Sequence, residues 1–152
     1  MTTTTEQEIY ALGETPPLGY VPPRMHASLI RPERFGDPNQ AFAIEEVDVP
    51  AVGARQVLVW VMAAGVNYNN VWAALGTPVN VIGARQRKGA EEDFHIGGSD
   101  ASGIVWAIGD DVDTVKVGDR VVLSCGMWDE NAADIAAGAD PMTSNTAKIW
   151  GY

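Results

Sequence analysis

Cysteine is almost absent from this 152-residue sequence, which contains only Cys125. One thiol cannot form a disulfide within the chain, and it cannot supply the several thiolates of a structural zinc site. Basic residues are also scarce: ten Lys and Arg stand against twenty Asp and Glu, which leaves a formal net charge of −10 at pH 7. Nucleic-acid binding needs a positive surface. We therefore expect no nucleic acid among the partners.

Long apolar runs are missing as well. No run approaches the ~18 consecutive apolar residues of a membrane span. The opening stretch MTTTTEQEIY has neither the basic region nor the apolar region of a secretory signal. These absences predict a soluble, cytoplasmic protein with no membrane partner.

The sequence does contain the apolar patterns that are typical of strands. Hydrophobic residues make up 46% of the chain, and turns rich in Gly and Asp interrupt them. Residues 56–66 place valines on one face and Leu, Trp and Met on the other, so we expect both faces to be buried. The candidate strands are residues 25–31, 41–49, 56–66, 103–108 and 115–123.

Helical signals are few. Residues 67–75 predict a polar loop that leads into one or two helical turns, ended by Gly76. Residues 77–94 are irregular and mixed in charge and predict a loop, whereas residues 126–147 predict a loop with a short helix at 129–137. Short strands with few helices predict a β-rich α+β fold built as a small β-barrel.

The two ends of the chain differ in character from its middle. Residues 1–23 are rich in Thr, Glu and Pro and predict an extended N-terminal arm, ordered only if it docks on something. Residues 24–152 then form the globular part. The ending KIWGY, residues 148–152, brings two aromatic rings to a terminus without a closing strand. We therefore expect the chain to be part of a longer protein.

Metal ligands are poorly represented. His26, His95 and Cys125 show no ligand spacing, and the carboxylates at residues 110–113 are typical of a turn between strands. The sequence predicts no metal site.

Motifs for a nucleophile or a cofactor are also weak. Ser99 stands in GGSDASG, which is not the Gly-x-Ser-x-Gly elbow of hydrolases. Gly97, Gly98 and Gly103 do not form Gly-x-Gly-x-x-Gly, so the chain carries no cofactor-binding motif of its own. Gly97 and Gly98 indicate instead positive φ or a close approach of the backbone.

One polar cluster, residues 67–70 (NYNN), directly follows the most apolar strand. Asn favours turns and helix N-caps, so one interpretation is purely local. The other is a carboxamide at the mouth of a pocket, where its NH2 donates to an oxygen that gains negative charge. The sequence alone leaves both open.

Three stretches, residues 57–76, 95–109 and 115–123, together resemble one superfamily. They are similar to the first half of the GroES-like catalytic domain of medium-chain dehydrogenases/reductases, which pair this domain with a Rossmann domain that binds a nicotinamide cofactor. Zinc-dependent members carry Cys where Asn67 stands here and His where Ser99 stands. The resemblance therefore implies a zinc-free branch that reduces activated C=C bonds.

Four finer features resemble the crotonyl-CoA carboxylase/reductase family: residues 12–27, 66–72, 96–109 and 140–152. This resemblance implies reduction of an enoyl-CoA by NADPH, with CO2 captured at the α-carbon to give an alkylmalonyl-CoA. It further implies a homotetramer, and a Rossmann domain outside this chain that supplies most contacts to NADP(H). Without that domain, the chain is expected to be inactive.

The same resemblance carries over two site residues. Asn69 matches the second Asn of the family's Asn-Tyr-Asn motif, and Tyr152 matches the aromatic residue of its Trp-Gly-Phe/Tyr-Glu motif; both belong to the CO2 pocket. Two alternatives remain at this stage. One is a zinc-free enoyl-CoA or quinone/enone reductase that does not carboxylate, and the other is a non-catalytic β-barrel binding module.

Overall fold

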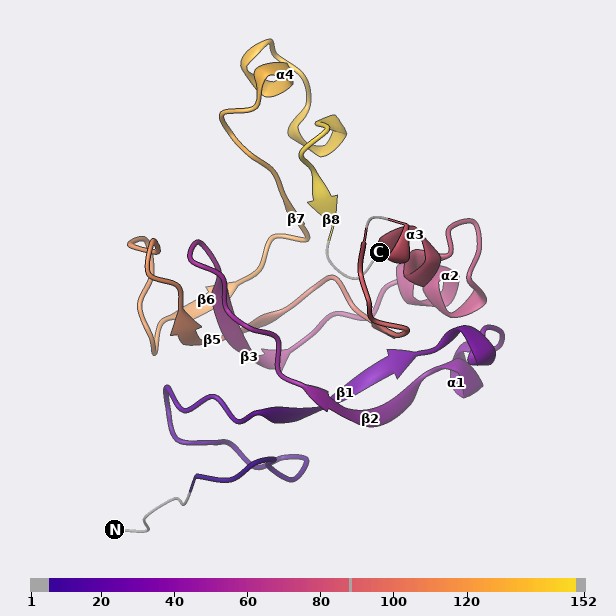
Figure 1. Cartoon of the computed structure of the whole chain (residues 1–152), viewed down its shortest axis with the longest axis vertical. Coiled ribbons are helices and arrows are strands. Elements are labelled where there is room, and N and C mark those ends of the chain that lie inside the picture. The colour runs from indigo at the N-terminus through magenta and orange to yellow at the C-terminus, as the bar shows by residue number, and fades with distance from the viewer. Residues whose placement is uncertain (1–5, 88, 150–152) are drawn as a thin grey trace.

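A computed structural model describes residues 6–87 and 89–149 of the chain (Figure 1). Its first sheet has three antiparallel strands in the order β2–β1–β4. They are β1 (Arg24–Ile30), β2 (Ala43–Asp48) and β4 (His95–Ile96). The register pairs Arg24 with Asp48 and Leu29 with Ala43. The strands predicted at 25–31 and 41–49 are therefore confirmed.

Short helices cover one end of this sheet. They are η1 (Pro32–Arg34), α1 (Pro38–Ala41), α2 (Asn69–Leu75) and α3 (Val81–Gln86). Helix α1 begins where the Asp37 carboxylate accepts a hydrogen bond from the Asn39 backbone N–H, 2.9 Å away. Helix α2 ends at Gly76, whose φ of 67° is a left-handed conformation that favours glycine. The helix predicted within residues 67–75 is confirmed.

The prediction of a loop throughout residues 77–94 is wrong, because helix α3 lies within this segment. The Asn80 side chain accepts a hydrogen bond from the Gly83 backbone N–H at 2.8 Å and so caps the helix. Val81 and Ile82 are buried against Ile30 of β1 and the alanines of α2. Tertiary burial stabilises this six-residue helix, which has a weak local signal.

The second sheet has the strand order β3–β5–β6 and is also antiparallel. Its strands are β3 (Val57–Ala63), β5 (Ser102–Ile108) and β6 (Arg120–Val122). The expectation that both faces of residues 56–66 are buried is wrong: Val61 is 51% exposed and Met62 is 61% exposed. Among the described strands, β3 lies at the edge of this sheet and pairs with β5 alone. An apolar strand is buried on both faces only where a second layer packs on each of them.

The N-terminal arm docks on the second sheet through its described residues, 6–23, which form no helix or strand. The Trp106 indole N–H of β5 donates a hydrogen bond to the Tyr20 carbonyl at 2.8 Å. Tyr10 is buried, with its ring centroid 6.3 Å from that of Tyr20. The arm is therefore held by contacts far along the chain, while the domain boundary at residue 24 stays a prediction.

A small lobe follows the second sheet and stands apart from it at the top of Figure 1. It contains β7 (Gly126–Met127), α4 (Ala133–Ala136), η2 (Pro141–Thr143) and β8 (Lys148–Ile149). The helix predicted at 129–137 is thus confirmed in shorter form. The expectation of no strand in residues 148–152 is wrong for its first two residues, because β8 pairs with β7.

The Asp134 carboxylate holds the lobe together. It accepts hydrogen bonds from the Asn145 backbone N–H at 2.9 Å, from the Ser144 hydroxyl at 3.1 Å and from the Ile135 backbone N–H at 2.9 Å. The bond from Asn145, and then that from Ser144, lower the pKa of Asp134 below its usual value, since both favour the charged form.

The fold is rich in strands and has only short helices, as the sequence predicts. Within the described ranges, no helix combines the length and apolar character needed to span a membrane.

Candidate functional site

The candidate site lies where the chain passes from β3 into α2. Strand β3 ends at Ala63, and α2 begins at Asn69. The Asn67 side-chain oxygen accepts a hydrogen bond from the Asn69 backbone N–H, with an O···N distance of 3.1 Å. This is the local turn that an Asn two residues earlier favours. The turn interpretation is therefore confirmed for Asn67.

Asn67 also crosses to a loop more than thirty residues further along the sequence. Its Nδ2 donates to Asp100 Oδ2 at 2.9 Å and lies 3.3 Å from Ser99 Oγ. Ser99 is only 8% exposed. The two positions that the resemblance aligned with zinc ligands, 67 and 99, are thus neighbours, and here they contact each other directly. Sequence reasoning missed the third partner, Asp100, because nothing in its local pattern separates it from a turn residue.

The same loop also passes close to Phe42 and to α2 at Gly97. A Cβ atom at Gly97 would lie 3.5 Å from Asn70 Oδ1 and 2.5 Å from the Phe42 ring, which is closer than real Cβ atoms approach. The backbone can therefore pass between Phe42 and α2 only because residue 97 is glycine. The close backbone approach predicted for Gly97 is confirmed.

Asn69 follows the anchored Asn67 by two residues and is the first residue of α2. Its side chain is half-buried and forms no hydrogen bond with any other residue that the structure describes. Tyr68 and Trp72 lie next to it on the helix, with ring centroids 5.5 Å apart, and Tyr68 is largely exposed. The Asn69 carboxamide therefore offers an NH2 donor and a carbonyl acceptor to a ligand.

The second predicted site residue, Tyr152, lies outside the described residues. A separate surface hollow of about 440 Å³ lies on the second sheet and is lined by residues such as Met62, Arg120 and Val122. Asn69 is not among its lining residues. The described residues thus contribute one donor group to the candidate site.

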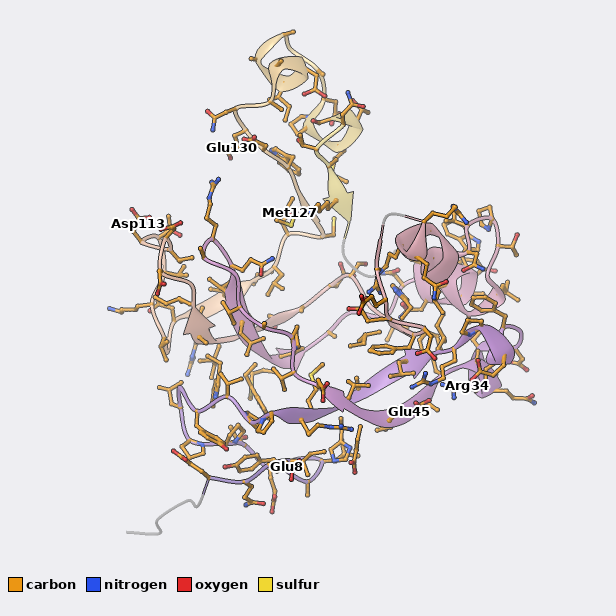
Figure 2. All side chains as sticks on the ribbon, viewed as in Figure 1. Glu8, Arg34, Glu45, Asp113, Met127 and Glu130 are labelled. Atoms are coloured by element: carbon orange, nitrogen blue, oxygen red, sulfur yellow. The ribbon has the colours of Figure 1, made fainter. Side chains whose placement is uncertain are left out.

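Sequence reasoning also missed an ion-pair network on the first sheet. Glu45 of β2 pairs with Arg34 at 2.6 Å and with Arg31 at 2.9 Å, and Arg31 also pairs with Asp93 at 2.7 Å. Figure 2 shows Arg34 and Glu45 close together below α1. The hydrogen bonds from Arg34, and then from Arg31, lower the pKa of Glu45. The network joins the first sheet to the segment that precedes β4.

Neither a metal-binding cluster nor a glycine turn of the dinucleotide-binding type is found among the described residues. In residues 6–87 and 89–149, no three His, Cys, Asp or Glu side chains cluster closely enough to share a metal. Gly97 and Gly98 precede strand β5, whereas the phosphates of a dinucleotide bind at a glycine turn between a strand and a helix. Gly97 and Gly98, which lie between β4 and β5, therefore do not form such a turn.

The chain is similar in sequence to proteins of one known domain family. The family model for the alcohol dehydrogenase GroES-like domain matches residues 53–152. A crotonyl-CoA carboxylase/reductase of Cereibacter sphaeroides is 51% identical over 97% of this chain, which spans 33% of that protein. A crotonyl-CoA reductase of Streptomyces avermitilis is 35% identical over 78% of this chain and 28% of its own length.

A solved structure shows the same similarity in three dimensions. The crotonyl-CoA carboxylase/reductase AntE in complex with NADP superposes with a TM-score of 0.87 and 64% identity, over 95% of this chain and 36% of that one. This chain thus spans about a third of the proteins it matches. The chain belongs to the alcohol dehydrogenase GroES-like family, in its crotonyl-CoA carboxylase/reductase branch.

Proposed function

We propose that this chain is part of an NADPH-dependent enzyme that reduces and carboxylates an α,β-unsaturated acyl-CoA of the crotonyl-CoA type. The observation that carries the proposal is the Asn69 carboxamide, which has no hydrogen-bond partner among the described residues and whose backbone N–H is fixed by the Asn67 side chain. Family membership supports the substrate class, since the relatives are named for crotonyl-CoA.

NADP(H) binding belongs, in this proposal, to a Rossmann domain in the part of the protein that this chain does not cover. The AntE structure was solved in complex with NADP, which supports the cofactor. When bound, NADPH supplies the hydride that leaves the acyl α-carbon electron-rich. We expect the 152-residue chain by itself to be inactive.

Asn69 has a defined role in the proposed reaction. CO2 is uncharged and accepts hydrogen bonds weakly, so it must be held beside the α-carbon in a site that excludes water. The Asn69 NH2 donates to one oxygen of CO2. As the α-carbon attacks the CO2 carbon, that oxygen gains negative charge and the hydrogen bond strengthens. A neutral carboxamide supplies no acidic proton that would quench the α-carbon.

Tyr152 is proposed as a second wall of the CO2 pocket, on the strength of the family motif alone. The enzyme is further proposed to be a cytoplasmic homotetramer that works without zinc. The direct Asn67–Ser99 contact supports the last point, because both positions are occupied by neutral side chains that bond to each other. Metal analysis of the purified complete enzyme, and its activity after chelator treatment, test zinc independence.

The direct test is product analysis with the complete enzyme, crotonyl-CoA, NADPH and ¹³C-bicarbonate. The expected product is an alkylmalonyl-CoA that carries the label. If only saturated acyl-CoA forms at saturating bicarbonate, carboxylation is refuted. The enzyme would then be a reductase, which is the alternative that the name of the Streptomyces avermitilis relative favours.

Asn69→Ala in the complete enzyme tests the role of the carboxamide. Loss of one donor to developing charge costs about 10²–10³ in rate in comparable sites, so carboxylated product should fall steeply relative to reduced product. Asn145→Ala, an exposed Asn in the lobe, is the control and should leave the product ratio unchanged. A wild-type ratio in Asn69→Ala would remove Asn69 from the mechanism.

A further inference from the structure

We propose that Asn67 is a positioning residue, which fixes Asn69 by tying the start of α2 to Ser99 and Asp100 and thereby favours CO2 capture over protonation. The inference rests on the proposed function, because it concerns how that same site is held. It assigns a role to a side chain that itself faces the protein rather than a ligand.

The Asn67 carboxamide can adopt only one orientation in this bridge. Its oxygen accepts from the Asn69 backbone N–H at 3.1 Å, while its Nδ2 faces Asp100 Oδ2 at 2.9 Å and Ser99 Oγ at 3.3 Å. Exchange of the oxygen and nitrogen would place the oxygen against the Asp100 carboxylate and two N–H groups against the Asn69 N–H. All three hydrogen bonds of the Asn67 carboxamide therefore require the same orientation of its oxygen and nitrogen.

The bridge acts directly on the residue that carries the proposed chemistry. The bond at the Asn67 oxygen ends on the backbone nitrogen of Asn69, so it fixes the origin of the Asn69 side chain. The bonds at Nδ2 end on the loop that also passes Asn70 at Gly97. The start of α2 is thus tied through Asn67 to the loop that carries Ser99 and Asp100.

The Asn67 bridge should matter more for carboxylation of the α-carbon than for its protonation by water. A misplacement of about 1 Å can cost 10²-fold in a step that depends on orientation. Carboxylation needs Asn69 to hold CO2 against the α-carbon, whereas protonation needs only an approaching water. Loosening α2 should therefore lower the share of carboxylated product before it lowers total turnover.

An exchange of donor and acceptor tests this role in the complete enzyme. Asn67→Asp keeps the acceptor for the Asn69 N–H but places a carboxylate where the donor faced Asp100. The double variant Asn67→Asp/Asp100→Asn restores one donor and one acceptor with reversed polarity and unchanged net charge, and the Ser99 hydroxyl can turn to donate. Asn39→Asp is the matched control, since Asn39, at an exposed position of α1, also donates to a neighbouring aspartate, Asp37.

The readout is the ratio of carboxylated to reduced acyl-CoA at saturating bicarbonate, together with the rate of NADPH oxidation. In Asn67→Asp we expect the ratio to fall about tenfold with a few-fold change in oxidation rate, on the scale of misplacement effects. The double variant should return to within about twofold of wild type. Asn39→Asp should keep the wild-type ratio.

Other outcomes overturn the inference. An unchanged ratio in Asn67→Asp, or an equal fall of both products that the double variant does not reverse, assigns Asn67 a purely structural role. If Asn67→Asp does not fold, Asn67→Ser replaces it, because the serine hydroxyl still accepts from the Asn69 N–H but is too short to reach Asp100. Absence of carboxylated product from the wild type refutes the proposed function instead, so the two failures are distinguishable.

Discussion

The second of the two three-stranded sheets has the more apolar strands, yet it leaves more of its large apolar side chains exposed than the first sheet does. In the first sheet, Leu29 and Ile30 are completely buried, and Ile30 packs against three short helices. In the second, Val61 is half-exposed and Val122 is 84% exposed. The difference comes from the layer above each sheet, since hydrophobic stabilisation depends on the apolar area that is removed from water.

The largest effect should come from Ile82, which links α3 to the first sheet and is 1% exposed. Ile82→Ala leaves a cavity, so the free energy of unfolding of the chain should fall by about 2–5 kcal/mol. Chemical denaturation measures it. A loss below ~1 kcal/mol would mean that the helical layer does not stabilise this sheet.

Glu45→Gln should weaken the same sheet in a pH-dependent way. The folded-state pKa of Glu45 is lowered, so its contribution to stability is fully present above its ordinary value of 4.5 and is lost as pH falls through the folded value. Melting temperatures between pH 7 and pH 3 should therefore converge for wild type and variant at the acid end. Glu130→Gln, in the exposed lobe, is the control; parallel curves for Glu45→Gln would contradict the prediction.

Trp106→Phe tests the one face of the second sheet on which the arm docks. The variant removes the indole donor to the Tyr20 carbonyl, a bond of 2.8 Å, and should cost about 1 kcal/mol. Limited proteolysis should then cut faster within residues 6–23. Unchanged cleavage would show that other contacts hold the arm.

The smallest effect is expected on the open part of this sheet. Val122→Ala removes a side chain that is already 84% exposed, so the unfolding free energy should change by less than ~0.5 kcal/mol. A loss comparable to that of Ile82→Ala would show that Val122 is covered in solution.

The strand pattern could be predicted from sequence because alternation of apolar residues and Gly-Asp turns is local. Helix α3 could not, since its stability depends on burial of Val81 and Ile82 against residues distant in the chain. The local sequence pattern predicted a turn at Asn67 and made Ser99 a poor candidate for a nucleophile. It did not show the contact between these two side chains, because they are far apart in the chain. The Glu45 network was equally hidden, because its four charges come from three separate segments.

The glycine at position 97 couples the candidate site to the hydrophobic core. Phe42, the ring that leaves no room for a side chain there, also packs on the buried cluster of Ile30 and Ile82. Even one added methyl group would push this ring into close-packed neighbours. Sequence change at position 97, in the loop that also carries Ser99 and Asp100, is therefore restricted by core packing as well as by the candidate site.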